Sequence, residues 1–97
     1  MSNTPVEAAY NPVCAKQLIR TIISDGTVII TQHAKREMQA DNLTIVDCIN
    51  VLRGGIVDPA EWENGAWRYR IHTAKIYVVV ELESEDKLVL ITAWRKL

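Results

Sequence analysis

The sequence predicts a single α+β domain over residues 11–97, in which two to three N-terminal helices pack on one face of an antiparallel sheet of about four strands. Apolar residues follow a helical spacing as far as Gly54-Gly55 and an alternating, strand-like spacing afterwards. The chain has neither internal repeats nor a linker-like segment, so its helices and strands must share one core. Residues 1–10 show neither period and are expected to form a flexible arm.

Three segments carry the signals that begin and end a helix: a capping side chain, apolar residues at helical spacing, and a terminating Gly, Asp or Asn. They run from Asn11-Pro12 to Asp25-Gly26, from Thr31 to Asp41-Asn42, and from Thr44 to Gly54-Gly55. Residues 27–31, between the first two, are rich in β-branched side chains and fit either a short strand or an extended connector.

The rest of the chain has the pattern of a strand meander. Residues 56–63 are extended, with Pro59 indicating an edge position or a bulge, and Asn64-Gly65 is a strong hairpin signal. Three further strands are expected over residues 66–73, 75–82 and 87–95.

Side chains alternate between the two faces of a strand, so the residues of the expected strand 66–73 divide into two sets. One face carries Trp67, Tyr69 and Ile71, and the other carries Arg68, Arg70 and His72. The second face is either a row of cations and proton carriers or the solvated side of a half-buried strand. We expect Trp62, Trp67 and Trp94 to pack in the core or at a sheet edge rather than to form base-stacking platforms.

Composition narrows the class of protein. The net charge of −1 and the pI near 6.1 argue against binding of nucleic acid through bulk charge, although a local basic site on a neutral domain is compatible with them. No apolar run is long enough to span a membrane, and no secretory signal pattern opens the chain, so the cytoplasm is the expected location. Cys14 and Cys48 lie within helical patterns and fit buried thiols better than a disulfide or a metal site.

The segment Thr31–Met38 predicts a helix with a histidine in its first turn. The first N–H groups of a helix are unpaired and its dipole is positive there, so His33 would lie at an anion-binding end, with Arg36 one turn further on. A neutral imidazole in such a place suits proton abstraction from a phosphate-bearing substrate. The alternative is an ordinary solvated surface histidine.

Together these segments resemble a known family. The residues concerned are the block His33-Ala34-Lys35-Arg36-Glu37-Met38, a capped helix ending in Gly-Gly, a hairpin with Arg-Tyr-Arg, a Val-rich strand, and Leu90-Ile91-Thr92-Ala93-Trp94. The chain resembles small bacterial domains of unknown function with an H-A-x-x-R-M signature, which are similar to the MqsR and RelE toxin superfamily. Family members often carry a second arginine soon after the methionine, where this chain has Gln39-Ala40-Asp41-Asn42; Lys16 and Arg20 could supply that charge instead.

The resemblance implies the toxin of a type II toxin–antitoxin system. Such a toxin is a metal-independent endoribonuclease that needs no cofactor, cuts messenger RNA, free or on the ribosome, and is held inactive by a cognate antitoxin. Cleavage would proceed by attack of a ribose 2′-hydroxyl on the adjacent phosphate, which requires a base, an acid and cationic stabilisation. Two alternatives stay open: a non-catalytic protein-binding or accessory domain of the same fold, and a subunit that associates through an exposed strand edge.

Candidate site residues follow from the chemistry of this reaction. His33 or His72 would act as base or acid, and Arg70, with Arg36 or Arg68, would hold the phosphate. The catalytic candidates are therefore His33, Arg70 and His72. The substrate-binding candidates are Arg36, Arg68, Tyr69, Thr92 and Arg95. No cluster of spaced ligands suggests a metal.

Overall fold

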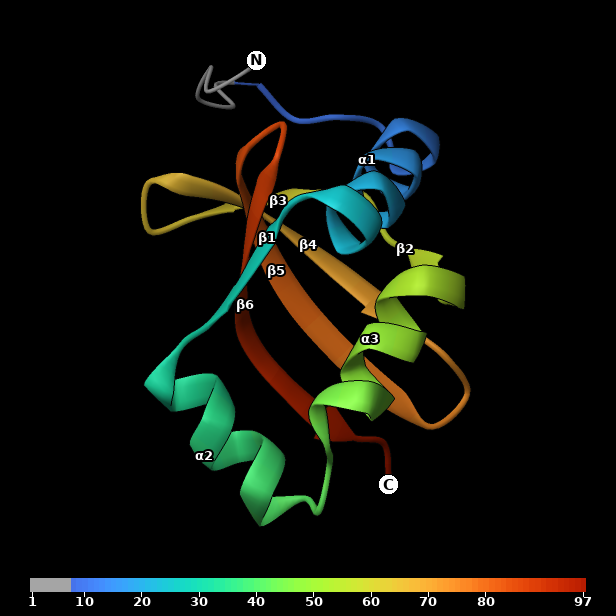
Figure 1. The fold of residues 1–97 in the computed structure, drawn as a ribbon, viewed down its shortest axis with the longest axis vertical. Coiled ribbons are helices and arrows are strands. Elements are labelled where there is room, and N and C mark those ends of the chain that lie inside the picture. The colour runs from blue at the N-terminus through green and yellow to red at the C-terminus, as the bar shows by residue number, and fades with distance from the viewer. Residues whose placement is uncertain (1–7) are drawn as a thin grey trace.

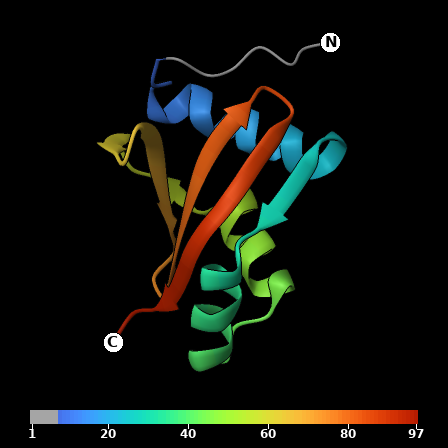
Figure 2. The same ribbon diagram turned by 90° about the vertical axis from the view of Figure 1, so that its left-hand side faces the viewer.

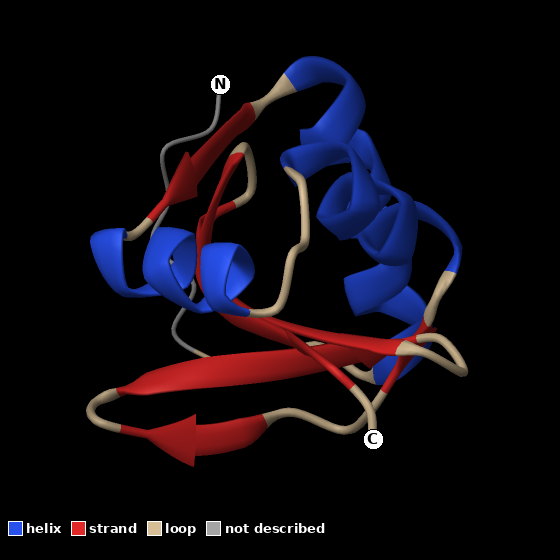
Figure 3. Ribbon diagram, turned by 90° about the horizontal axis from the view of Figure 1, so that it is seen from below, coloured by secondary structure: helices blue, strands red, loops and turns tan. Residues whose placement is uncertain are grey.

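Three helices cover one face of a six-stranded sheet in the computed structural model, which describes residues 8–97 (Figure 1). The elements are α1 (Pro12–Asp25), β1 (Thr27–Ile30), α2 (Gln32–Ala40), α3 (Ile45–Gly54), β2 (Ile56–Val57), β3 (Glu61–Glu63), β4 (Ala66–His72), β5 (Ile76–Ser84) and β6 (Lys87–Arg95). All three helices lie on the same side of the sheet (Figure 3). The predicted α+β class is thus confirmed.

The sheet differs from the predicted antiparallel meander in two places. Its order is β1-β6-β5-β4-β2, with β3 also paired to β4. β1 runs parallel to β6, from Thr27 opposite Lys87 to Ile30 opposite Leu90, so the sheet is mixed. The expected strand over residues 56–63 is divided into β2 and β3, because the intervening segment contains Pro59, which has no N–H to donate to a ladder.

Side-chain caps begin all three helices, as predicted. Asn11 and Thr31 each accept a hydrogen bond from the backbone N–H three residues later, at 2.8 Å and 3.0 Å. Thr44 and Asp47 form a reciprocal capping box with bonds of 2.9 Å and 3.2 Å. These bonds lower the pKa of Asp47 from its ordinary value of 3.8. The larger effect comes from the hydrogen bond with the Thr44 backbone, and the next from the bond with the Thr44 side chain. The capping box therefore contributes stability above that pH and loses it as the pH falls through the lowered pKa.

Thr31 also joins α2 to β6, which makes it a test of this junction. Its N–H donates to the Leu90 carbonyl and its hydroxyl to the Ile91 carbonyl, both at 3.2 Å. We expect Thr31→Ala to lower the free energy of unfolding by about 1–2 kcal/mol, because the cap and the hydroxyl's bond to Ile91 are both lost, while the backbone bond to Leu90 remains. Urea unfolding measures this, and Thr31→Ser, which keeps the hydroxyl, should lose less than half as much. Equal losses in the two variants would contradict the role of the hydroxyl.

The core lies between the helices and the inner face of the sheet. Its largest fully buried side chains include Ile19, Ile22, Cys48, Leu52, Tyr69, Ile71, Val78, Val80, Leu88 and Leu90. Cys48 is buried as predicted, but the same prediction for Cys14 is wrong, because Cys14 lies on the solvent side of the first turn of α1.

The first described helix and the C-terminus lie at opposite ends of the fold. The sequence predicts a flexible arm over residues 1–10. Its residues 1–7 lie outside the described part of the chain. The backbone N–H of Tyr10 donates to the Tyr69 hydroxyl at 2.8 Å. Figure 2 shows α1 crossing one end of the sheet and the C-terminus at the other. No helix in residues 8–97 has the length and apolarity to cross a membrane.

Candidate functional site

The face of the sheet that the helices leave uncovered, here called the outer face, carries three cross-strand rows of side chains. Paired residues on neighbouring strands point to the same side, so the strand registers define each row. From β4 through β5 to β6 the rows are His72, Tyr77 and Trp94; Arg70, Val79 and Thr92; and Arg68, Glu81 and Val89. The predicted alternation of β4 is confirmed, since Tyr69 and Ile71 between these positions are fully buried.

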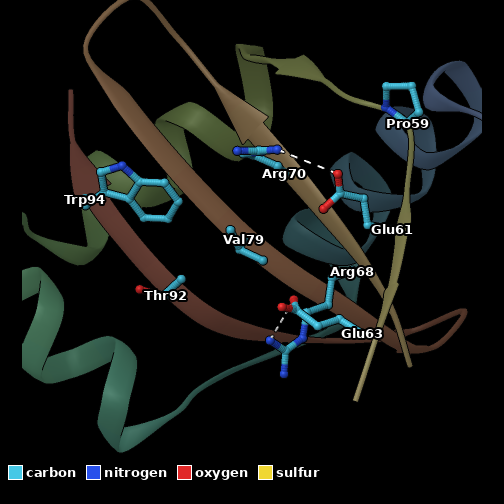
Figure 4. A pocket seen from close by; sticks show the side chains of 8 residues that line it. All are labelled: Pro59, Glu61, Glu63, Arg68, Arg70, Val79, Thr92 and Trp94. Carbon is cyan, nitrogen blue, oxygen red and sulfur yellow. Dashed lines mark hydrogen bonds and ion pairs between the residues drawn. The ribbon is translucent and has the colours of Figure 1, made fainter. Parts of the chain in front are cut away.

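A hollow of about 280 Å³ lies on the outer face (Figure 4). The segment that carries Pro59, Glu61 and Glu63 lies along one side of it, and Thr92 and Trp94 of β6 lie along the other. The side chains of Arg68, Arg70 and Val79 line the hollow between them. The hollow therefore combines cations, carboxylates, a hydroxyl and an indole ring.

The two arginines of the hollow are held differently. Arg68 donates hydrogen bonds to Glu81 at 2.9 Å and to Glu63 at 3.2 Å, and the bond to Glu81 is the main cause of its raised pKa. Arg70 makes only longer ion pairs, 3.6 Å to Asp58 and 3.9 Å to Glu61, and its side chain is 42% exposed against 21% for Arg68. Arg68 is thus committed to its carboxylates, whereas Arg70 keeps N–H donors for a ligand.

Both ring nitrogens of His72 have partners. Nε2 lies 3.1 Å from Asp58 Oδ1, and Nδ1 lies 3.2 Å from Lys96 Nζ. A lysine ammonium can only donate, so Nδ1 accepts from Lys96 while Nε2–H donates to Asp58. Asp58 therefore orients the imidazole and contacts Arg70 as well, linking these two candidate residues.

The structure brings together four of the predicted site residues. Arg68, Arg70, His72 and Thr92 share the outer face. Tyr69 lies on the opposite face of β4, fully buried, where burial raises the pKa of its hydroxyl. No ligand on the outer face can reach Tyr69 without opening the core.

The other three predicted residues stand apart from the hollow. Arg95 donates to the carbonyls of Asp41 at 2.9 Å and Asn42 at 3.0 Å, which ties the loop after α2 to the end of β6. His33 and Arg36 are exposed on α2, and within residues 8–97 no hydrogen bond or ion pair joins them to the outer face. The helix that carries them packs beside β6 through its buried Ala34 and Met38.

Sequence reasoning missed four members of the outer face: Asp58, Tyr77, Trp94 and Lys96. The Tyr77 ring stacks on Trp94 with centroids 5.1 Å apart and lies 5.2 Å from the His72 ring. Lys96 Nζ lies 4.4 Å and Arg70 Cζ 5.6 Å from the Tyr77 centroid. The available signal was alternation, since Val78 and Ala93 point inward and turn their neighbours Tyr77 and Trp94 outward.

The three tryptophans have different surroundings, and the expectation of core or edge packing is confirmed for Trp67 and for Trp62, which lies on the edge strand β3. Trp67 packs against the core, Trp62 is 59% exposed on the hairpin, and Trp94 lies on the outer face. Trp62 and Trp67 contact each other edge to face at 5.2 Å. Only Trp94 of the three lines the hollow.

These features define a small α+β domain with an uncovered sheet face that is both aromatic and cationic. The chain belongs to the family described as Domain of unknown function (DUF4258), whose sequence model matches residues 30–95, more than half of the 97 residues. No curated protein and no solved structure matches the chain.

The matched span includes α2 and most of the outer face, but not α1 or Lys96. The block starting at His33 has Glu37 where the H-A-x-x-R-M signature has arginine, so the signature is not met in full and Arg36 lies one position early.

Proposed function

We propose that this domain is the toxin of a type II toxin–antitoxin system, a metal-independent endoribonuclease that binds messenger RNA on the outer face. The observation that carries the proposal is Arg70, a half-exposed guanidinium held only by long ion pairs; it lies beside an oriented imidazole and lines a hollow that also contains the Thr92 hydroxyl. Planar guanidinium groups suit bidentate binding of phosphate. A phosphate that displaces Asp58 and Glu61 from Arg70 would replace weak contacts with charge-assisted hydrogen bonds.

The proposed reaction is attack by the ribose 2′-oxygen on the adjacent phosphorus. A base removes the 2′-hydroxyl proton, the new O–P bond forms, and the bond from phosphorus to the 5′-oxygen breaks with protonation of that oxygen. The products are a 2′,3′-cyclic phosphate and a 5′-hydroxyl. His72 serves as base through Nδ1 once Lys96 moves aside, and the Lys96 ammonium protonates the leaving oxygen. Arg70 stabilises the charge that develops on the phosphate oxygens.

Auxiliary groups and partners complete this proposal. Thr92 contributes a hydroxyl donor in the hollow, while His33 and Arg36 on α2 would contact phosphates that flank the cleaved one. A cognate antitoxin, encoded by an adjacent gene, would present acidic or apolar segments to the outer face and exclude RNA. With these partners, the domain would act in the cytoplasm.

Cleavage by the purified domain tests the proposal. End-labelled RNA should be cut equally with and without EDTA and leave cyclic phosphate and 5′-hydroxyl ends. Arg70→Ala and His72→Ala should each lower the rate at least about 100-fold, because each removes a group that acts in the transition state. Arg53→Ala changes an exposed cation on α3 and should cut at the wild-type rate.

Induced expression in a bacterial host provides the second readout. Growth should stop with loss of messenger RNA, and Arg70→Ala should restore growth without a change in melting temperature, since its side chain is 42% exposed. The assignment would be overturned if the folded Arg70→Ala protein cut RNA at the wild-type rate. His33→Ala decides whether α2 belongs to the site.

A second candidate, a non-catalytic protein-binding domain, is favoured by the charge of the hollow. Glu63 and Glu81 pair with Arg68, and Asp58 and Glu61 pair with Arg70, so four carboxylates surround the two guanidinium groups of the hollow. Excess negative charge weakens attraction for a phosphate backbone. Intact RNA at high protein concentration, with a matched active toxin cutting the same RNA, would support this candidate.

A further inference from the structure

Two aromatic side chains occupy the face of the sheet that the core does not use. Tyr77 and Trp94 are cross-strand partners on β5 and β6, with ring planes 27° apart and centroids separated by 5.1 Å. The inner face supplies the buried side chains of these same strands, including Val78 and Ala93. The stacked pair is half-buried and lies outside the core that stabilises the fold, on the face that the helices leave uncovered.

The surroundings of this pair match the needs of a nucleotide. Lys96 lies 4.4 Å and Arg70 5.6 Å from the Tyr77 centroid, so cations adjoin the rings. Trp94 also lines the hollow that contains Arg70 (Figure 4). A base stacked on the indole would thus leave its phosphate within reach of a guanidinium with available donors.

The size and shape of the hollow favour an unpaired base. At about 280 Å³ it lies just below the usual range for small-molecule sites, which suits a single planar ring system. In duplex RNA the bases are stacked on each other, and the deep groove keeps side chains from them, whereas unpaired bases can stack on aromatic side chains of a sheet.

We infer that Tyr77 and Trp94 form a stacking surface for one unpaired nucleobase, with Trp94 in contact with the base and Tyr77 holding the indole in place. This inference rests on the proposed function for the identity of the ligand as RNA. It adds a selectivity: the outer face takes single-stranded RNA and rejects the same sequence in a duplex.

Binding of an RNA that cannot be cleaved tests the inference separately from catalysis. The probe is a short 2′-O-methyl oligonucleotide with a terminal fluorophore, used as a single strand and as a duplex, with anisotropy reporting the dissociation constant. We expect Trp94→Ala to raise the dissociation constant for the single strand at least about tenfold, and the duplex to bind at least about tenfold more weakly than the single strand. Trp94→Phe keeps a ring and should lose about threefold or less.

Trp62→Ala is the matched control. It removes an indole that is 59% exposed but lies away from the outer face, and its dissociation constant should stay within about twofold of the wild type. Equal binding by Trp94→Ala and the wild type, or equal binding of duplex and single strand, would overturn the inference. If Trp94→Ala does not fold, a Trp94→Leu protein of wild-type stability replaces it and should show the same loss.

The binding and cleavage results separate the two proposals. Trp94-dependent binding of the 2′-O-methyl strand, with no cutting of unmodified RNA, would support the stacking surface and reject the endoribonuclease. Cutting by Trp94→Ala at the wild-type rate, with unchanged binding, would reject the stacking surface and keep the endoribonuclease.

Discussion

Alanine at position 55 is expected to destabilise the domain by about 2–3 kcal/mol, because a side chain there overpacks a closed junction. A Cβ on Gly55 would lie 2.7 Å from the Val51 carbonyl oxygen, 2.8 Å from the His72 carbonyl oxygen and 2.9 Å from Ile71 Cγ2. Two of these three atoms are backbone, so neither can turn away as a side chain would. The last turn of α3 must therefore distort, and it must also move away from His72 of β4, the residue that carries the candidate imidazole.

The neighbouring glycine provides the matched control. A Cβ on Gly54 would meet nothing within 4 Å, and Gly54 is the last residue of α3. We expect Gly54→Ala to raise the free energy of unfolding by about 0.5–1 kcal/mol, the usual gain from replacing a helical glycine. Urea unfolding of the two variants should give shifts of opposite sign. A Gly55→Ala protein as stable as the wild type would show that α3 does not approach β4 this closely.

The second large effect concerns the two thiols. A thiol reagent should modify Cys14 at least about 100-fold faster than Cys48 in the folded protein, because only an accessible thiolate reacts. Cys48 is 0% exposed, and burial, aided by the Asp47 charge, raises its pKa from 9.0 to about 11. That rise alone lowers the thiolate fraction near pH 8 about 100-fold. Any direct reaction at Cys48 should speed up about tenfold per pH unit until the pH approaches 11.

Mass spectrometry after timed iodoacetamide treatment measures this difference. In urea the two sites should react at similar rates, and Cys14→Ser should leave only the slow site in the folded protein. Equal labelling of both thiols in the folded protein, with no effect of urea, would contradict the burial of Cys48. The slow rate also reports local opening of α3, because exchange through an open state depends on its population.

Local signals account for the elements that were predicted well. The caps at Asn11, Thr31 and Thr44 involve residues within one helical turn of each other, so sequence spacing alone reveals them. The hairpin at Asn64-Gly65 follows the same logic, since both residues adopt the positive φ that its turn requires. The two faces of β4 were equally visible, because alternation is a property of the strand itself.

The candidate site was predicted in part for the same reason. Arg68, Arg70 and His72 share one strand, and their common orientation needs no tertiary information. Asp58, Tyr77 and Lys96 lie on other segments of the chain. They contact His72 only because folding brings those segments against β4. The register of β5 with β6 also shifts between Val79 and Val80, a change that no local pattern marks.

Short-range chemistry in the chain therefore determined the α+β class, the helix caps, the hairpin and the cationic side of β4, because each depends on residues close together in sequence. Contacts between distant segments decided the rest. Folding placed β1 parallel to β6, separated His33 and Tyr69 from the hollow, and set the stacked Tyr77 and Trp94 rings beside Arg70. Strand order and register are settled by which apolar faces can be buried together, and that is a property of the whole chain.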